Sequence, residues 1–192
     1  MAALVTGGTI TIKNVSKTAV SAFLSVLNKM GASYEFQGDD LTVWYGGETF
    51  SPVEVTSSPA PGFITDWLPA LTVLLTQVKG ESTLTDTIYL GKWDFVRDLN
   101  RMGAKINLNE DSVVIQGPTS FYGVTLDIEN IRAGNALLLA TLCSETSCDL
   151  RGTEYLSVLH ENLLEKLQKL GAKILILDKN PSKTPPTSTE DL

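Results

Sequence analysis

A short motif, Leu or Met followed by Gly-Ala, occurs three times in this sequence, as Met30-Gly31-Ala32, Met102-Gly103-Ala104 and Leu170-Gly171-Ala172. The three glycines are spaced 72 and 68 residues apart. Each copy follows a stretch with apolar residues at helical spacing and precedes a β-rich run. Glycine readily adopts the left-handed conformation that commonly ends a helix. The motif therefore predicts three copies of one helix–strand unit.

The helices before these glycines are predicted to be amphipathic, with Ser16 as the N-cap of the first. Helices of this kind are expected to cover a sheet with one side and to face water with the other. Their apolar stripes consist of Val20, Phe23, Leu24 and Leu27, then Phe95, Val96, Leu99 and Met102, and finally Leu156, Leu159, Leu163, Leu167 and Leu170.

Two further predicted helices, Asp66–Val78 and Arg132–Cys143, are apolar almost all round. A helix without a polar face must be surrounded by protein. We therefore expect an α/β fold, an α+β prism of repeated β/α units with parallel helices buried inside and sheets outside. The expected strands are Thr9–Lys13, Ser33–Phe36, Leu41–Tyr45, Ser82–Thr87, Lys105–Leu108, Ser112–Gln116, Gly123–Asp127, Ser147–Arg151 and Lys173–Leu177.

The repeats place residues 1–178 in a single domain of three units. Residues 179–192 contain three prolines and no apolar residue before Leu192. Such a segment cannot bury enough surface to offset the entropy of ordering, so it is expected to be a disordered tail.

Composition argues against several classes of protein. The net charge is −7 and the 15 Lys and Arg residues are scattered, which disfavours nucleic-acid binding. No stretch approaches the roughly 20 unbroken apolar residues of a membrane span, and Met1–Val5 does not have the composition of a secretory signal. We therefore expect a cytoplasmic protein with Cys143 and Cys148 as free thiols. With His160 as the one histidine, a zinc cluster is not expected.

The common catalytic motifs are absent, so the candidate site comes from the repeat register. Asp66 opens the first buried helix and Arg132 the second, and Lys92 and Val158 each follow 26 residues later. Helix N-termini favour anions. An acid such as Asp66 is ordinary in a first turn, whereas an arginine there opposes the helix dipole unless an anion lies nearby. Arg132 is therefore expected to meet an anion.

A family resemblance rests on five motifs and covers about residues 6–178. Their order and spacing resemble those of the UDP-N-acetylglucosamine 1-carboxyvinyltransferases, which belong to the enolpyruvyl transferases. These enzymes transfer enolpyruvate from phosphoenolpyruvate to the sugar 3-hydroxyl in peptidoglycan precursor synthesis. The resemblance implies two domains of three β/α units each, with parallel helices buried inside. The five motifs are Pro61-Gly62-Phe63-Ile64-Thr65-Asp66, Asp86-Thr87-Ile88-Tyr89, Arg101-Met102-Gly103-Ala104, Ile131-Arg132-Ala133 and Leu170-Gly171-Ala172.

The resemblance also implies roles for individual residues. Asp66 matches the proposed catalytic base for the sugar hydroxyl, and a carboxylate in hydrogen-bond reach can take that proton. Arg132 matches an arginine that binds phosphoenolpyruvate, whose anionic groups suit a planar guanidinium. Thr65, Ile88 and Lys92 are expected to bind substrate as well. No cofactor or metal is expected, because phosphoenolpyruvate brings the reactive group.

Two positions depart from the family pattern. Lys92 stands where the family has an arginine, and Val158 stands where another active-site arginine is expected. We therefore expect the C-terminal-type domain of such a transferase, inactive alone, that acts with a complementary catalytic-loop domain. Two alternatives remain open: a non-catalytic binding or scaffold module that kept the fold, and a domain of a 5-enolpyruvylshikimate-3-phosphate synthase.

Overall fold

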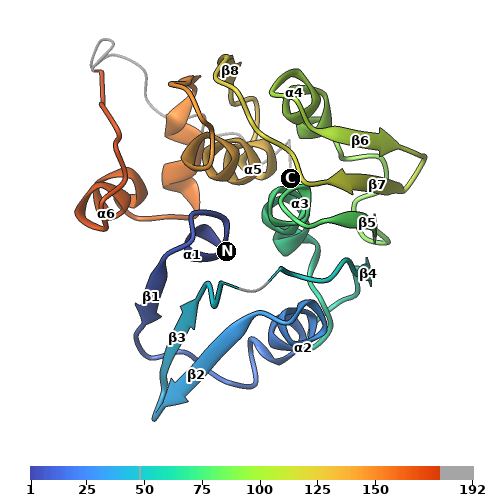
Figure 1. Ribbon diagram of the computed structural model, residues 1–192, viewed down its shortest axis with the longest axis vertical. Coiled ribbons are helices and arrows are strands. Elements are labelled where there is room, and N and C mark those ends of the chain that lie inside the picture. Colours follow the sequence, from blue (N-terminus) through green and yellow to red (C-terminus); the bar gives the residue numbers. More distant parts are fainter. Residues whose placement is uncertain (48, 178–192) are drawn as a thin grey trace.

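A computed structural model describes residues 1–47 and 49–177, which form three units that begin with the same order of elements (Figure 1). Each unit begins with an inner helix, followed by a strand and an outer helix. The first unit contains α1 (Ala2–Val5), β1 (Thr9–Ile12), α2 (Ser21–Met30), β2 (Ser33–Gln37), β3 (Asp40–Trp44) and β4 (Glu54–Thr56). The second contains the 3₁₀ turn η1 (Thr65–Trp67), α3 (Leu68–Thr76), β5 (Gly80–Thr85), α4 (Phe95–Arg101), β6 (Lys105–Leu108), β7 (Ser112–Gly117) and β8 (Thr125–Asp127). The third contains α5 (Ile131–Leu142), β9 (Asp149–Arg151), the 3₁₀ helix η2 (Thr153–Val158) and α6 (Leu163–Lys169).

The described strands form three sheets, ordered β1-β3-β2, β4-β5-β7-β6 and β8-β9. Strand β4 leaves the first unit to pair with β5 of the second, and β8 leaves the second unit to pair with β9 of the third. Both of these pairings are parallel, while the strands within a unit pair antiparallel. The last strand of one unit thus joins it to the sheet of the next.

The inner helices lie at the centre, with the sheets around them (Figure 1). Helices α3 and α5 pack against each other, and the short α1 contacts both. Leu68, Leu71 and Leu74 of α3 have no exposed surface, nor do Ala136 and Leu137 of α5. Burying one such leucine contributes about 1.5–3 kcal/mol, so helices that are apolar on all sides are stabilised only at this central place. The predicted arrangement of buried helices and outer sheets is confirmed.

The Gly-Ala motifs end the three outer helices in the same way. The glycines have positive φ angles of 78°, 108° and 102° at Gly31, Gly103 and Gly171. The alanine N–H that follows each glycine donates to the carbonyl five residues earlier, at N···O distances of 2.9, 3.0 and 3.0 Å. This hydrogen bond is typical of helix ends with a left-handed glycine. The structural reason for the repeated motif is therefore confirmed.

Two predictions about the outer helices are wrong. Helix α2 begins at Ser21 with Val20 at the N-cap, so Ser16 does not cap it. The third outer helix is broken: η2 ends at Val158, and α6 begins only after Asn162, which has a φ angle of 50°. Asparagine tolerates this left-handed conformation better than most residues, and it interrupts the helix.

Eight of the nine predicted strands occur, whereas α1 and β4 were not predicted. The exception is Lys173–Leu177, which lies outside every described sheet. A strand needs a neighbour for its backbone hydrogen bonds, and β3 and β7 provide one for β2 and β6. The described part of the third unit has no corresponding strand. The predicted tail, residues 179–192, lies outside the described residues, and none of the described helices could span a membrane.

Candidate functional site

The candidate site centres on a buried carboxylate at the end of β5. The side chain of Asp86 has no exposed surface. Its Oδ2 accepts hydrogen bonds from Thr65 Oγ1 at 2.6 Å and from Arg132 Nη2 at 2.9 Å. The Nη1 of Arg132 donates to Thr65 Oγ1 at 2.7 Å. The three side chains therefore form a closed ring of hydrogen bonds between η1, β5 and α5.

The other carboxylate oxygen of Asp86 organises the turn after β5. Its Oδ1 accepts from Ser57 Oγ at 2.8 Å and from the backbone N–H groups of Ile88 and Tyr89 at 3.0 and 3.3 Å. Ser57 follows β4, and its hydroxyl also accepts from the N–H of Thr87 at 2.8 Å. One carboxylate thus joins the ends of β4, β5, η1 and α5.

Arg132 is the second residue of α5, whose N-cap Asn130 accepts a hydrogen bond from the N–H of Ala133 at 2.9 Å. The Arg132 side chain is 16% exposed, and its guanidinium carbon lies 5.3 Å from the centre of the Tyr89 ring. Its Nε is buried and has no partner within the described residues. A guanidinium has five N–H groups, and the ring with Thr65 and Asp86 uses two of them. Arg132 therefore keeps donors for a ligand.

The charges in this network stabilise each other. Burial by itself raises the pKa of Asp86, but hydrogen bonds, with the largest effect from Thr65 and the next from Arg132, lower it below the ordinary value. Asp86 is therefore an anion beside the Arg132 guanidinium. The anion expected near this helix N-terminus is present as a side chain of the protein itself.

The structure brings three of the five predicted site residues together. Thr65 and Arg132 contact the Asp86 carboxylate through their side chains, and Ile88 contacts it through its backbone N–H. Asp66 is next to Thr65 in η1, and its side chain is exposed. Because Thr65 contacts Arg132, the N-terminal ends of α3 and α5 lie at the same end of the molecule.

The remaining positions are less closely tied to this network. Lys92 is exposed, and its backbone N–H donates to the carbonyl of Tyr89 at 3.3 Å. Val158 is 58% exposed at the end of η2. Sequence reasoning assigned no role to Asp86, although it lies in one of the five motifs. A single acid at the end of an alternating strand was the available signal.

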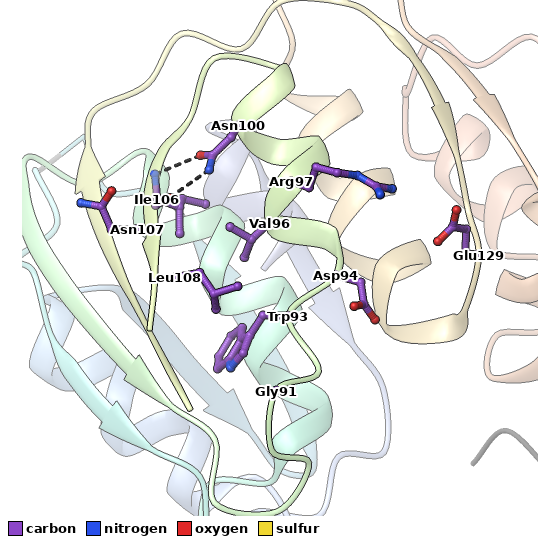
Figure 2. Close-up of a pocket in the computed structure, with 10 residues that line it drawn as sticks. All are labelled: Gly91, Trp93, Asp94, Val96, Arg97, Asn100, Ile106, Asn107, Leu108 and Glu129. Carbon is purple, nitrogen blue, oxygen red and sulfur yellow. Dashed lines mark hydrogen bonds between the residues drawn. The ribbon is translucent and has the colours of Figure 1, made fainter. Parts of the chain in front are cut away.

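One hollow in the described structure is lined by Gly91 and Trp93, the sequence neighbours of Lys92, but not by Lys92 itself. It has a volume of about 520 Å³ and lies between α4 and β6. Figure 2 shows Asp94, Arg97 and Glu129 on one side of it, and Leu108 and Ile106 on the other. None of the five predicted site residues lines this hollow.

Comparison with known proteins shows the family. The family model for EPSP synthase (3-phosphoshikimate 1-carboxyvinyltransferase) matches residues 1–167. UDP-N-acetylglucosamine 1-carboxyvinyltransferase 2 of Geobacillus kaustophilus is 34% identical over 174 residues, which cover 91% of this chain and 40% of that protein. The protein of the same name from Bacillus subtilis is 34% identical over 168 residues, covering 88% of this chain and 39% of that protein.

Solved structures agree on the fold. The enolpyruvyl transferase NikO from Streptomyces tendae superposes with a TM-score of 0.81 at 24% identity, over 89% of this chain and 42% of that one. An EPSP synthase from Acinetobacter baumannii superposes with a TM-score of 0.57 at 21% identity, over 75% and 36%. The chain spans about 40% of the length of the curated relatives it matches. It has an enolpyruvyl-transferase fold and belongs to the EPSP synthase family.

Proposed function

We propose that this chain forms one wall of the active site of a UDP-N-acetylglucosamine enolpyruvyl transferase. The observation that carries the proposal is the hydrogen bond between Thr65 and Arg132. It places the exposed Asp66, and an arginine with unused N–H donors, at the same end of two buried helices. The 34% identity to transferases of that name supports this choice of substrate. The reaction transfers the enolpyruvyl group from phosphoenolpyruvate to the sugar 3-hydroxyl and releases phosphate. This reaction would belong to the synthesis of peptidoglycan precursors in the cytoplasm.

In this proposal each site residue has a distinct role. Asp66 takes the proton of the sugar hydroxyl, which an exposed carboxylate can do. Arg132 uses its free N–H groups to hold the carboxylate or phosphate of phosphoenolpyruvate. Lys92 adds positive charge. Thr65 in η1 and Ile88 in the turn after β5 contact the substrate. Neither described hollow is lined by any of the five residues, which fits a site completed by a second wall.

We propose that a complementary catalytic-loop domain supplies this second wall. The third unit supports the proposal. In the second unit, β7 lies between β5 and β6 in the sheet. In the third unit, β9 corresponds to β5 and residues 173–177 correspond to β6, but no described strand corresponds to β7. Both β9 and residues 171–177 line a hollow of about 1270 Å³, and Leu150, Leu164 and Leu167 contribute to the same lining.

A strand of the complementary domain would fill this hollow, antiparallel to β9 as β7 is to β5. Alone, the chain cannot position both substrates and is expected to be inactive.

Two other functions compete with this proposal. A non-catalytic module that kept the fold is favoured by Lys92 and Val158, which depart from the family's arginines. A 5-enolpyruvylshikimate-3-phosphate synthase domain is favoured by the name of the matching family model. Binding titrations that include shikimate 3-phosphate as a ligand distinguish the proposed transferase from the non-catalytic module and from the synthase domain.

Removing Arg132 tests the proposal directly. In titrations of the chain followed by amide NMR, Arg132→Ala is expected to weaken phosphoenolpyruvate binding by ~1.5–3 kcal/mol, the scale of a charge-assisted hydrogen bond. This corresponds to about a 10- to 150-fold rise in Kd. Arg97→Ala is the matched control, because Arg97 is a largely exposed arginine that lines the smaller hollow.

The expected pattern is a loss of affinity in Arg132→Ala and none in Arg97→Ala, with shifts from UDP-N-acetylglucosamine but not from shikimate 3-phosphate. A wild-type chain that responds to no ligand, both alone and in a mixture with the complementary domain, would support the non-catalytic module. A response to shikimate 3-phosphate in place of the sugar nucleotide would support the synthase.

A further inference from the structure

Asp86 has a role that the resemblance does not assign. We propose that Asp86 is the positioning residue of the site, which sets the direction of Arg132 and holds the η1 turn that carries Asp66. This inference rests on the proposed function. It concerns a residue that touches no substrate and acts through the groups it binds.

The donors to Asp86 are the first argument. Its carboxylate accepts five hydrogen bonds, and three come from predicted site residues, namely Thr65, Ile88 and Arg132. These donors are on three segments far apart in the sequence. Removal of the carboxylate would therefore release every contact that links η1, the 86–89 turn and α5 through this side chain.

A second buried carboxylate gives a comparison within the same chain. Asp98 of α4 is 8% exposed and pairs with Arg101 at 2.8 Å and with Arg97 at 3.6 Å. Both of these arginines are more than half exposed, and none of the five predicted site residues bonds to Asp98. Asp98 is therefore buried and paired with arginine, as Asp86 is, but it is not connected to the site.

The geometry of Arg132 is the second argument. Its Nη2 meets Asp86 and its Nη1 meets Thr65, so two anchors fix the plane of the guanidinium. The Tyr89 ring lies 5.3 Å from the guanidinium carbon, and the backbone N–H of Tyr89 donates to Asp86. The carboxylate therefore sets both the plane of the guanidinium and the turn whose ring lies against it. One N–H on each Nη remains for a ligand, while the Nε–H is buried beside them.

Asp86→Asn is the decisive substitution, because it keeps the size of the side chain. An amide nitrogen can only donate, so one side of the new residue would face donors without being able to accept from them. The Arg132 guanidinium would lose its charged anchor and gain rotational freedom. Asp98→Asn makes the same chemical change at a buried carboxylate away from the site.

The readout is the Arg132 side chain in ¹⁵N NMR, with inorganic phosphate as the probe ligand. In the wild type we expect a slowly exchanging Nε–H signal that shifts on addition of phosphate. In Asp86→Asn we expect at least ten-fold faster exchange of that proton with water and about ten-fold weaker phosphate binding. Asp98→Asn is expected to lower Tm while leaving the Arg132 signal and the phosphate affinity unchanged.

The outcomes separate this inference from the proposed function. An Arg132 Nε–H that exchanges equally slowly in Asp86→Asn and in the wild type overturns the positioning role. Faster exchange in a chain that does not bind phosphate, either alone or mixed with the complementary domain, supports the positioning role and overturns the proposed function. If Asp86→Asn does not fold, Thr65→Val removes the second anchor of Arg132 while keeping the carboxylate. This variant should speed Nε–H exchange less than ten-fold, because Asp86 still holds Nη2, and exchange at least ten-fold faster there would make Thr65 rather than Asp86 the positioning residue.

Discussion

At the scale of single residues, Arg132 was identified from the sequence because a cation at a helix N-terminus is unfavourable without an anion. The structure supplies that anion as Asp86, 2.9 Å from Nη2. The sequence could not identify this partner, because the two residues are 46 positions apart. No local sequence pattern indicates that the end of β5 lies next to the start of α5. The need for an anion was predictable, but its source was not.

The ion pair predicts how stability depends on pH. The pKa of Asp86 is lowered in the folded state, so its stabilisation is complete above the unfolded pKa of about 3.9 and is lost as the pH falls below that value. Removing one partner of a buried pair costs about 3–5 kcal/mol near neutral pH. In urea unfolding, the wild type should exceed Asp86→Asn by about this amount at pH 6, and the difference should shrink at pH 3. A difference that stays constant between these pH values would show that Asp86 does not titrate as proposed.

At the scale of elements, the glycines that end the outer helices were the most reliable signal in the sequence. Their backbone requirement is local, and so it can be read without knowledge of the fold. The break in the third outer helix was not predictable in the same way. The leucine pattern continues through Leu159 and Leu163, but Asn162 adopts a left-handed conformation between η2 and α6.

The glycines are predicted to differ in how far they tolerate a side chain. Alanine at Gly31 would have to adopt a positive φ angle in open space, at a cost of about 1–2 kcal/mol. At Gly103 a Cβ would also lie 2.7 Å from Cε1 of Tyr122, which adds about 1 kcal/mol or more of overpacking. Urea denaturation should therefore find Gly103→Ala less stable than Gly31→Ala. Equal losses at the two positions would mean that the Tyr122 ring moves aside freely.

At the scale of the whole molecule, the repeat and the two apolar helices were sufficient to predict three units with helices inside and sheets outside. The sequence did not reveal that residues 173–177 remain outside the described sheets. Their apolar pattern is that of a strand, but pairing depends on a neighbour that the pattern cannot supply. Leu175 is 81% exposed and Leu177 is 66% exposed, as expected of an apolar strand that lacks its partner.

The central claim is that this chain is one wall of an enolpyruvyl transferase site and needs a second. The most direct test measures phosphate release from phosphoenolpyruvate and UDP-N-acetylglucosamine, for the chain alone and after mixing with a separately expressed complementary domain. We predict no release above background from the chain alone, release from the mixture, and loss of that release with Asp66→Asn while substrate binding is kept, because an amide cannot take the hydroxyl proton. Robust turnover by the chain alone, or a mixture that is equally active with Asp66→Asn, would contradict the claim.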